Sequence, residues 1–111
     1  MGADSLQILG LCRRAGKLAA GFDRVKQSVL RGQAYLLAVS EEISPKTKKE
    51  IEYLGRQEGL PIVTLAAGVN DLWYITGQRA GVFSITDQAL AEKILRELGA
   101  DGAKAKQEET E

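Results

Sequence analysis

The chain has 111 residues, the size of one domain, and its 15 basic and 15 acidic residues give a formal net charge of zero. A single cysteine and the absence of histidine exclude an intramolecular disulfide, a Cys/His zinc site and histidine-based acid–base catalysis. No apolar run approaches the ~20 residues of a membrane span and no signal-peptide pattern is present, so we expect a cytoplasmic protein that does not contact a membrane.

The charges are segregated along the chain. Between Cys12 and Arg31 there is one acidic residue, Asp23, against six basic residues: Arg13, Arg14, Lys17, Arg24, Lys26 and Arg31. The last residues are acidic instead: Glu108, Glu109 and Glu111. Such segregation creates a local field that the net charge does not reveal.

The first predicted elements are two helices joined by a short extended segment. The first helix ends at Gly16, and residues 17–20 form the extended link or a short strand. Gly21 begins the second helix, and Gly32 ends it. The apolar residues of this second helix follow a helical spacing and predict its buried face: Phe22, Val25 and Val29.

Three apolar runs predict strands: Ala34–Val39, Pro61–Leu65 and Gly81–Thr86. The first run is apolar without interruption, as expected for a strand covered on both faces. The strands alternate with helices, which predicts an α/β domain: a three-layer α-β-α sandwich around a small, mostly parallel, mixed sheet of about four strands. We expect this single domain to cover residues 1–98 and to be followed by a disordered charged tail, residues 99–111.

Three further helices are predicted between and after these strands. Ser44, followed by proline, begins one helix that Gly59 ends. Either Asn70 or Asp71 caps a short helix that ends at Gly77. A cap at Thr86 or Asp87 begins the last helix, which reaches Leu98.

The Gly16-Lys17 pair raises the question of a phosphate-binding loop. The P-loop motif needs four residues between its glycines, then Gly-Lys followed by serine or threonine, between a strand and a helix. Here five residues separate Gly10 from Gly16, and Leu18 follows the lysine. We therefore interpret Gly10 as a site of close helix packing and Gly16 as a helix end.

The start of the helix at Gly21 is a second candidate for anion binding, because the first N–H groups of a helix have no partner within it. Arg24, Gln27 and Arg31 lie on the side opposite the apolar face, and Lys17 lies in the approach. This surface either contacts phosphates and bases or is a solvated helix face with ordinary charges. Residue chemistry alone favours the solvated face.

The segment "NDLWYITG" contains the only tryptophan of the chain. Trp73 or Tyr74 could stack on an unpaired base, but an aromatic residue on a short helix is more often part of the core. We therefore expect one of the two to anchor the helix on the sheet. Cys12 is interpreted as a small core residue, and the lysines of "SPKTKKE" as exposed charges.

Three segments resemble a known family in their order and spacing: "LGLCRRAGKLAAG", "TKKEIE", and "NDLWYITG" followed by "GVFSITD". Together they resemble the small bacterial YlxQ-type proteins, within the kink-turn RNA-binding ribosomal-protein superfamily of L-seven-Ae, L-thirty-e and Gadd-like proteins. The resemblance covers residues 5–98. It implies a three-layer α-β-α sandwich that binds structured RNA, such as sharply bent internal loops.

The resemblance also implies RNA-binding positions. In kink-turn binders a G-K-x-x-x-G lead-in is followed by an Asn-Glu-x-x-Lys set, and "GKLAAG" matches this lead-in, which places Lys17 and Gly21. In this chain that set is replaced by Asp23, Arg24 and Gln27. An ionised Asp only accepts hydrogen bonds, whereas the Asn amide also donates them, and an Arg in place of Glu inverts the charge.

A second RNA-facing loop, apolar in those binders, corresponds to Gln78, Arg79 and Ala80 in this chain. In the helix before it, Trp73 occupies a position where the family usually has glycine. The replacements leave a positive surface to which Arg31 also contributes, and this surface suits phosphate contact better than the inherited reading of bases.

Three functions remain as hypotheses. The preferred one is a non-catalytic protein that binds ribosomal or other structured RNA, with the ribosome as a further expected partner. We expect this protein to be a monomer without cofactor or metal. The alternative is a protein-interaction module on the same fold that has lost kink-turn RNA binding. A small enzyme or nucleotide binder is the third, against which the lack of histidine and of a P-loop counts.

Overall fold

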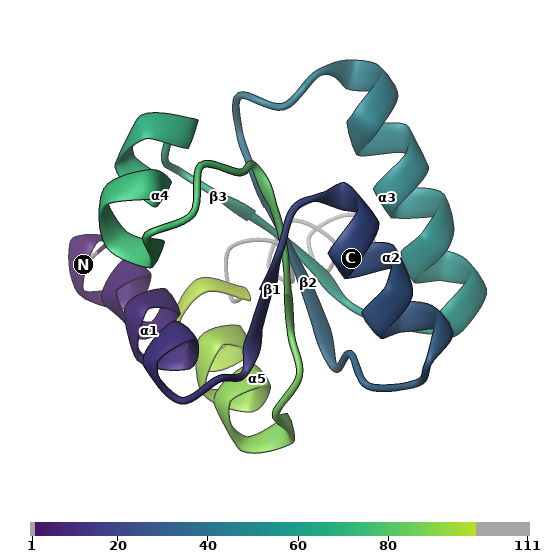
Figure 1. Ribbon diagram of the computed structural model, residues 1–111, viewed down its shortest axis with the longest axis horizontal. Helices are drawn as coiled ribbons and strands as arrows, with labels where there is room; N and C mark the ends of the chain where they lie inside the picture. Colours follow the sequence, from purple (N-terminus) through teal and green to yellow (C-terminus); the bar gives the residue numbers. More distant parts are fainter. Residues whose placement is uncertain (1, 100–111) are drawn as a thin grey trace, which may run out of the picture.

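The computed structural model describes residues 2–99, so the predicted tail, apart from Gly99, lies outside the described residues. The elements in chain order are α1 (Gly2–Arg14), β1 (Leu18–Ala20), α2 (Phe22–Leu30), β2 (Leu36–Ser40), α3 (Pro45–Glu58), β3 (Ile62–Leu65), α4 (Val69–Thr76), β4 (Val82–Ile85), α5 (Gln88–Ile94) and a π-helical turn, η1 (Leu95–Gly99). Helices lie on both sides of the sheet (Figure 1), which confirms the predicted α/β sandwich.

The four strands form one mixed sheet in the order β1-β4-β2-β3. Only β2 and β3 are parallel, because β4 runs antiparallel to both β1 and β2. The mixed sheet is therefore confirmed, but parallel pairing does not predominate as expected. Between β3 and β4 the chain does not cross the sheet, so β4 begins at the end of the sheet where β3 ends. The Ser40 N–H, at the end of β2, donates to the Gly81 carbonyl just before β4, at 2.8 Å.

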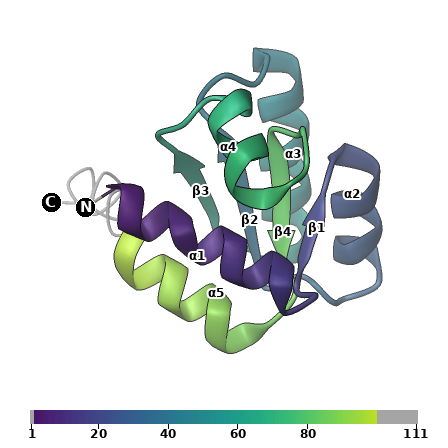
Figure 2. The same ribbon diagram turned by 60° about the vertical axis from the view of Figure 1, so that its left-hand side comes forward.

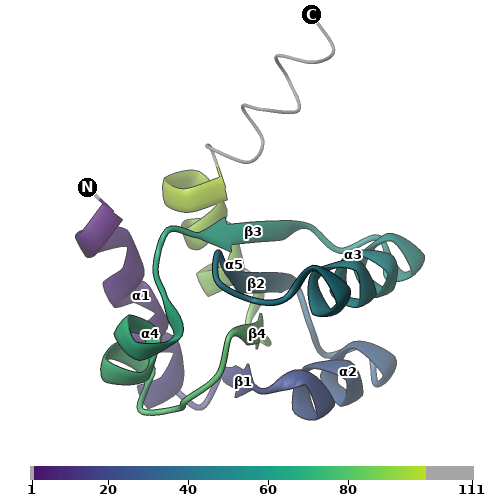
Figure 3. The same ribbon diagram turned by 90° about the horizontal axis from the view of Figure 1, so that it is seen from above.

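Two apolar clusters bind the layers together. Figure 3 shows α1, α4 and α5 on one side of the sheet and α2 and α3 on the other, and Figure 2 shows α1 and α5 running side by side. In β2, Leu36 and Ala38 pack in the first cluster while Leu37 and Val39 pack in the second. Alternate side chains of β2 thus enter opposite cores, which explains its uninterrupted apolar sequence.

The end of α1 settles the role of the Gly-Lys pair. The Gly16 N–H donates to the Arg13 carbonyl (3.0 Å) and the Lys17 N–H to the Cys12 carbonyl (2.8 Å), with Gly16 at φ +73°. These are the bonds of a Schellman helix end, as predicted for Gly16. A Cβ on Gly10 would lie 3.2 Å from the Ile75 carbonyl oxygen, so Gly10 allows α1 to pack closely against α4.

Two predicted helix caps are confirmed. Ser44 caps α3 by accepting from the Thr47 N–H at 3.2 Å. Of the two alternatives for α5, the cap is Asp87, whose carboxylate accepts from the Leu90 N–H at 2.9 Å. The predicted extent of this last helix to Leu98 is met only by including η1, since regular α-helix ends at Ile94.

The predicted start of α4 is wrong. The helix begins at Val69, so Asn70 and Asp71 lie inside its first turn, and Gly68 holds the cap position without a side chain to offer. Glu42, from the loop after β2, supplies the missing acceptor: its Oε1 accepts from the Val69 N–H at 3.1 Å. Because the capping residue lies 27 residues away in sequence, no local pattern indicates where α4 begins.

Candidate nucleic-acid interface

The start of α2 has unusual backbone geometry. Gly21 occupies the cap position at φ +97°, where an L side chain is strained, and its N–H donates to the Val82 carbonyl of β4 at 2.9 Å. No side chain caps this helix, and the first intrahelical bond comes from Val25 to the Gly21 carbonyl (2.9 Å). The N–H groups of residues 22–24 therefore have no partner within α2, at the positive end of the helix dipole.

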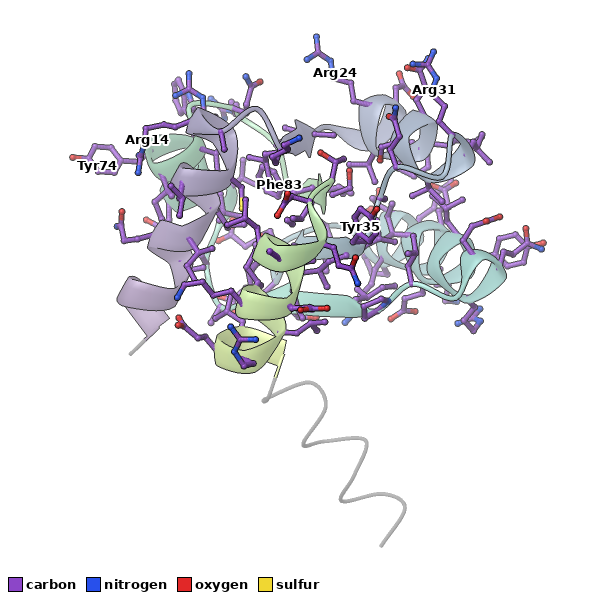
Figure 4. The ribbon with its side chains drawn as sticks, turned by 90° about the horizontal axis from the view of Figure 1, so that it is seen from below. Arg14, Arg24, Arg31, Tyr35, Tyr74 and Phe83 are labelled. Atoms are coloured by element: carbon purple, nitrogen blue, oxygen red, sulfur yellow. The ribbon has the colours of Figure 1, made fainter. Side chains whose placement is uncertain are left out.

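Three of the predicted site residues line one groove. Arg24, Gln27 and Arg31 form its helical wall, and its opposite wall comes from the turn before β1 and from β1 itself, with Leu18 and Ala19; its volume is about 300 Å³. We call this the α2 groove. Gln33 also lines it, a residue that the helical pattern missed because it follows the helix end. Figure 4 shows Arg24 and Arg31 projecting outward from α2.

The cationic side chains of the α2 groove are not neutralised by carboxylates. Among the residues whose side chains the structure describes, the one ion pair within 4.0 Å joins Lys93 and Glu97 on the last helix, at 3.8 Å. Arg24 and Arg31 are exposed and keep their charges available. Asp23 is also exposed, in the first turn of α2, where a carboxylate is favourable to the helix dipole.

Lys17 does not join this group. Its carbonyl accepts from the Thr86 N–H at 3.0 Å, at the end of β1 opposite Gly21. Together with Asp87 and Glu92 it lines a separate open surface. The lysine of the "GKLAAG" lead-in thus lies among carboxylates, away from the start of α2.

The second predicted loop, with Gln78 and Arg79, connects α4 to β4 and leaves both side chains exposed. The Gln78 N–H donates to the hydroxyl of Thr76 (3.1 Å), which fixes the start of the loop. The Arg79 guanidinium carbon lies 5.3 Å from the centroid of the Trp73 ring, a cation–π contact. The loop leads into β4 and ends next to Val82, whose carbonyl accepts the hydrogen bond from the Gly21 N–H.

The expected aromatic anchor of α4 is wrong. Trp73 is 48% exposed and Tyr74 93% exposed, whereas Leu72 is fully buried and holds the helix against the sheet. Leu72 and Thr76, four residues apart, form the inward face, so the two aromatic residues lie outside it. The exposed pair is therefore unexplained by packing.

Cys12 and the carboxylates are the remaining groups that could bind a metal ion or act as a nucleophile. Among the side chains that the structure describes, no group of three or more His, Cys, Asp or Glu could hold a metal ion. Cys12 is fully buried, and burial, followed by the Asp87 carboxylate, raises the pKa of its thiol to about 11, so it is not a thiolate nucleophile at neutral pH. Within the same residues no helix has the length and apolar character needed to cross a bilayer.

Comparison with known proteins tests the resemblance to the kink-turn RNA-binding superfamily. No protein-family model matches the chain. Over 69 residues the sequence is 28% identical to the large ribosomal subunit protein eL30 of Aeropyrum pernix, an alignment that covers 62% of this chain and 69% of that protein.

Solved structures share the fold. A protein with unknown function from Bacillus halodurans superposes with a TM-score of 0.78 at 25% identity, covering 83% of this chain and 93% of that one. The 15.5kD RNA binding protein of Giardia lamblia superposes with a TM-score of 0.73 at 18% identity, covering 86% and 84%. The similarity to eL30, together with this fold, supports the superfamily of L-seven-Ae and L-thirty-e proteins; the YlxQ-type subgroup stays a prediction.

Proposed function

We propose that this protein binds structured RNA, without catalysing a reaction, and that it does so through the α2 groove and the start of α2. The observation that carries the proposal is the pair of exposed arginines, Arg24 and Arg31, which line one groove with Gln27 and form no ion pair with any carboxylate whose position the structure describes. The same helix begins without a side-chain cap. Arginine guanidinium and helix N-termini are the groups that contact RNA phosphates. The similarity to eL30 adds support for ribosomal RNA as the class of ligand.

The proposed interface extends from Gly21 and Asp23 to the loop of Gln78 and Arg79; Lys17, which lies on a separate surface with Asp87 and Glu92, is left out of it. Shape and phosphate positions would select the RNA, as is usual for structured RNA. The replacement of the Asn-Glu-x-x-Lys set removes the inherited base contacts, so affinity for a bent internal loop would come from its backbone geometry. We further propose that the protein is a cytoplasmic monomer of the YlxQ-type subgroup and that it binds the ribosome through ribosomal RNA.

Reversing the charge of Arg24 tests this interface. We expect Arg24→Glu to weaken binding of a kink-turn RNA and of ribosomal RNA fragments roughly 10- to 100-fold, because a charge-assisted hydrogen bond is lost and a repulsive carboxylate is introduced. Filter binding at one salt concentration measures the effect. Arg56→Glu is the matched control, since Arg56 is an exposed helical arginine near β3, the opposite edge of the sheet.

Equal loss in both variants would make the effect one of net charge and would refute the assigned groove. The loss of all three kink-turn residues favours a second candidate, a protein-interaction module that has lost RNA binding. For that candidate we expect the parent protein to bind neither RNA, and to retain a stable protein partner that Arg24→Glu does not release.

A further inference from the structure

The outer face of α4 presents two adjacent aromatic side chains to solvent, Trp73 and Tyr74. The helix does not need them for packing, because Leu72 is fully buried and the buried Thr76 hydroxyl donates to the Leu72 carbonyl at 2.7 Å. Tyr74, at 93% exposure, gains little from folding, and Trp73 leaves about half of its surface in water. Adjacent exposed aromatic groups are a feature of binding surfaces. In Figure 4, Tyr74 projects clear of the ribbon.

A surface hollow of about 320 Å³ lies among Asn70, Trp73 and Tyr74. These positions are i, i+3 and i+4, and therefore share one face of α4. The aromatic rings supply flat apolar surfaces, and the Asn70 amide supplies both a hydrogen-bond donor and an acceptor. A nucleobase has the same two requirements: a face to stack and a polar edge to satisfy.

The charges around the hollow also suit a nucleic acid. The Arg79 guanidinium lies over the Trp73 ring. A second guanidinium lies against the end of α4, since a Cβ on Gly77 would be 2.7 Å from the Arg13 guanidinium carbon. Two carboxylates lie at the start of α4: Asp71 in its first turn, and Glu42, which accepts from the Val69 N–H. Both are placed where the helix dipole favours a negative charge.

The hollow is connected to the start of α2 by a short path through Arg79, which lies over the Trp73 ring. Arg79 precedes Val82 by three residues, which span at most about 11 Å of chain, and the Val82 carbonyl accepts from the Gly21 N–H. A single RNA molecule held at the start of α2 can therefore extend to α4. A stable protein interface takes roughly 20–30 residues a side, far more than this three-residue hollow provides.

We propose that Trp73 and Tyr74 stack one unpaired base of the RNA bound at the α2 groove, with Asn70 at the edge of that base. The proposal rests on the proposed function, because it needs an RNA bound at α2. It assigns a role to aromatic residues that neither the core nor the α2 groove uses.

The experiment compares a kink-turn RNA with the same RNA in which the unpaired nucleotides carry no bases. For the RNA with bases we expect Trp73→Ala and Tyr74→Ala each to weaken binding about 5- to 100-fold, the usual range for loss of one stacking contact. For the base-free RNA we expect parent and variants to bind alike. Trp73 is the only tryptophan in the chain, so its fluorescence reports stacking directly and should change only with the RNA that carries bases.

Tyr53→Ala is the matched control, since Tyr53 is an exposed tyrosine on α3. The 93% exposure of Tyr74 keeps its variant free of folding effects, and Trp73→Phe should restore most of the affinity. Unchanged RNA affinity in both alanine variants, with Arg24→Glu still weakening binding, would overturn the stacking site and leave the proposed function standing. Self-association that depends on the two aromatics, without any effect on RNA, would also overturn it. Failure of the parent to bind either RNA would refute the proposed function itself.

Discussion

At the scale of single residues, Cys12 shows how burial controls chemistry. It is fully buried, and burial together with the Asp87 carboxylate raises the pKa of its thiol from 9.0 to about 11. At pH 8 the thiolate fraction in the folded protein is then roughly 100-fold smaller than in the unfolded chain. We expect iodoacetamide at pH 8 to alkylate the folded protein at least 100-fold more slowly than the same protein in urea, as followed by mass spectrometry. Comparable rates in both states would show that Cys12 is accessible.

Residue roles that depend on local chemistry could be predicted, and those that depend on a distant neighbour could not. The helix end at Gly16 and the buried position of Cys12 follow from the spacing of nearby residues. The exposure of Trp73 and Tyr74 does not, because aromatic residues are usually buried; only the spacing of Leu72 and Thr76 indicates that α4 turns them outward. Sequence proximity places Lys17 with Gly21, but the extended strand β1 separates the two residues.

At the scale of elements, the start of α4 depends on a side chain from another loop. Glu42 accepts from the Val69 N–H at 3.1 Å, in place of a local cap. We expect Glu42→Ala to lower the free energy of unfolding by about 1 kcal/mol, the usual cost of losing a helix cap, and Glu42→Gln to lose less because its amide oxygen can still accept. Urea unfolding measures both variants.

Glu41→Ala provides the comparison for Glu42, because Glu41 is an exposed neighbour on the same loop whose backbone N–H, and not its side chain, bonds to Leu65. A loss as large in Glu41→Ala as in Glu42→Ala would argue against the cap. The close fit explains Gly68 as well: a Cβ there would lie 2.5 Å from a Glu42 carboxylate oxygen, so a side chain at this position would displace the cap.

The sequence predicted the elements better than their pairing. Both long helices, α1 and α3, and the strands β2, β3 and β4 lie where periodicity and apolar runs placed them. The order β1-β4-β2-β3 could not be predicted, because it depends on α4 staying at one end of the sheet and on a three-residue edge strand pairing with β4. The order nevertheless matters for function, since it brings Gly21 beside Val82.

At the scale of the whole molecule, a formal net charge of zero conceals a basic edge. The exposed arginines of α2 flank the edge strand β1, and Arg79 lies on the loop that enters the neighbouring strand β4. The fold thus places cations that are 55 residues apart in sequence, Arg24 and Arg79, on segments next to the two strands β1 and β4 at one edge of the sheet. An RNA would experience this local field and not the net charge, because screening at physiological salt limits electrostatic interactions to about 8 Å.

The salt dependence of binding tests that local field. If Arg24, Arg31 and Arg79 each neutralise one phosphate, the logarithm of the association constant should fall against the logarithm of salt concentration with a slope of about −2 to −3. Replacing Arg31 by Gln should reduce the magnitude of the slope by about one contact, since it removes one charge from the α2 groove. Arg56→Gln should leave the slope as in the parent. Fluorescence titrations with a kink-turn RNA between 50 and 300 mM salt, on the order of the range over which such slopes are measured, give all three values. A parent slope near zero would mean that RNA phosphates do not contact this edge.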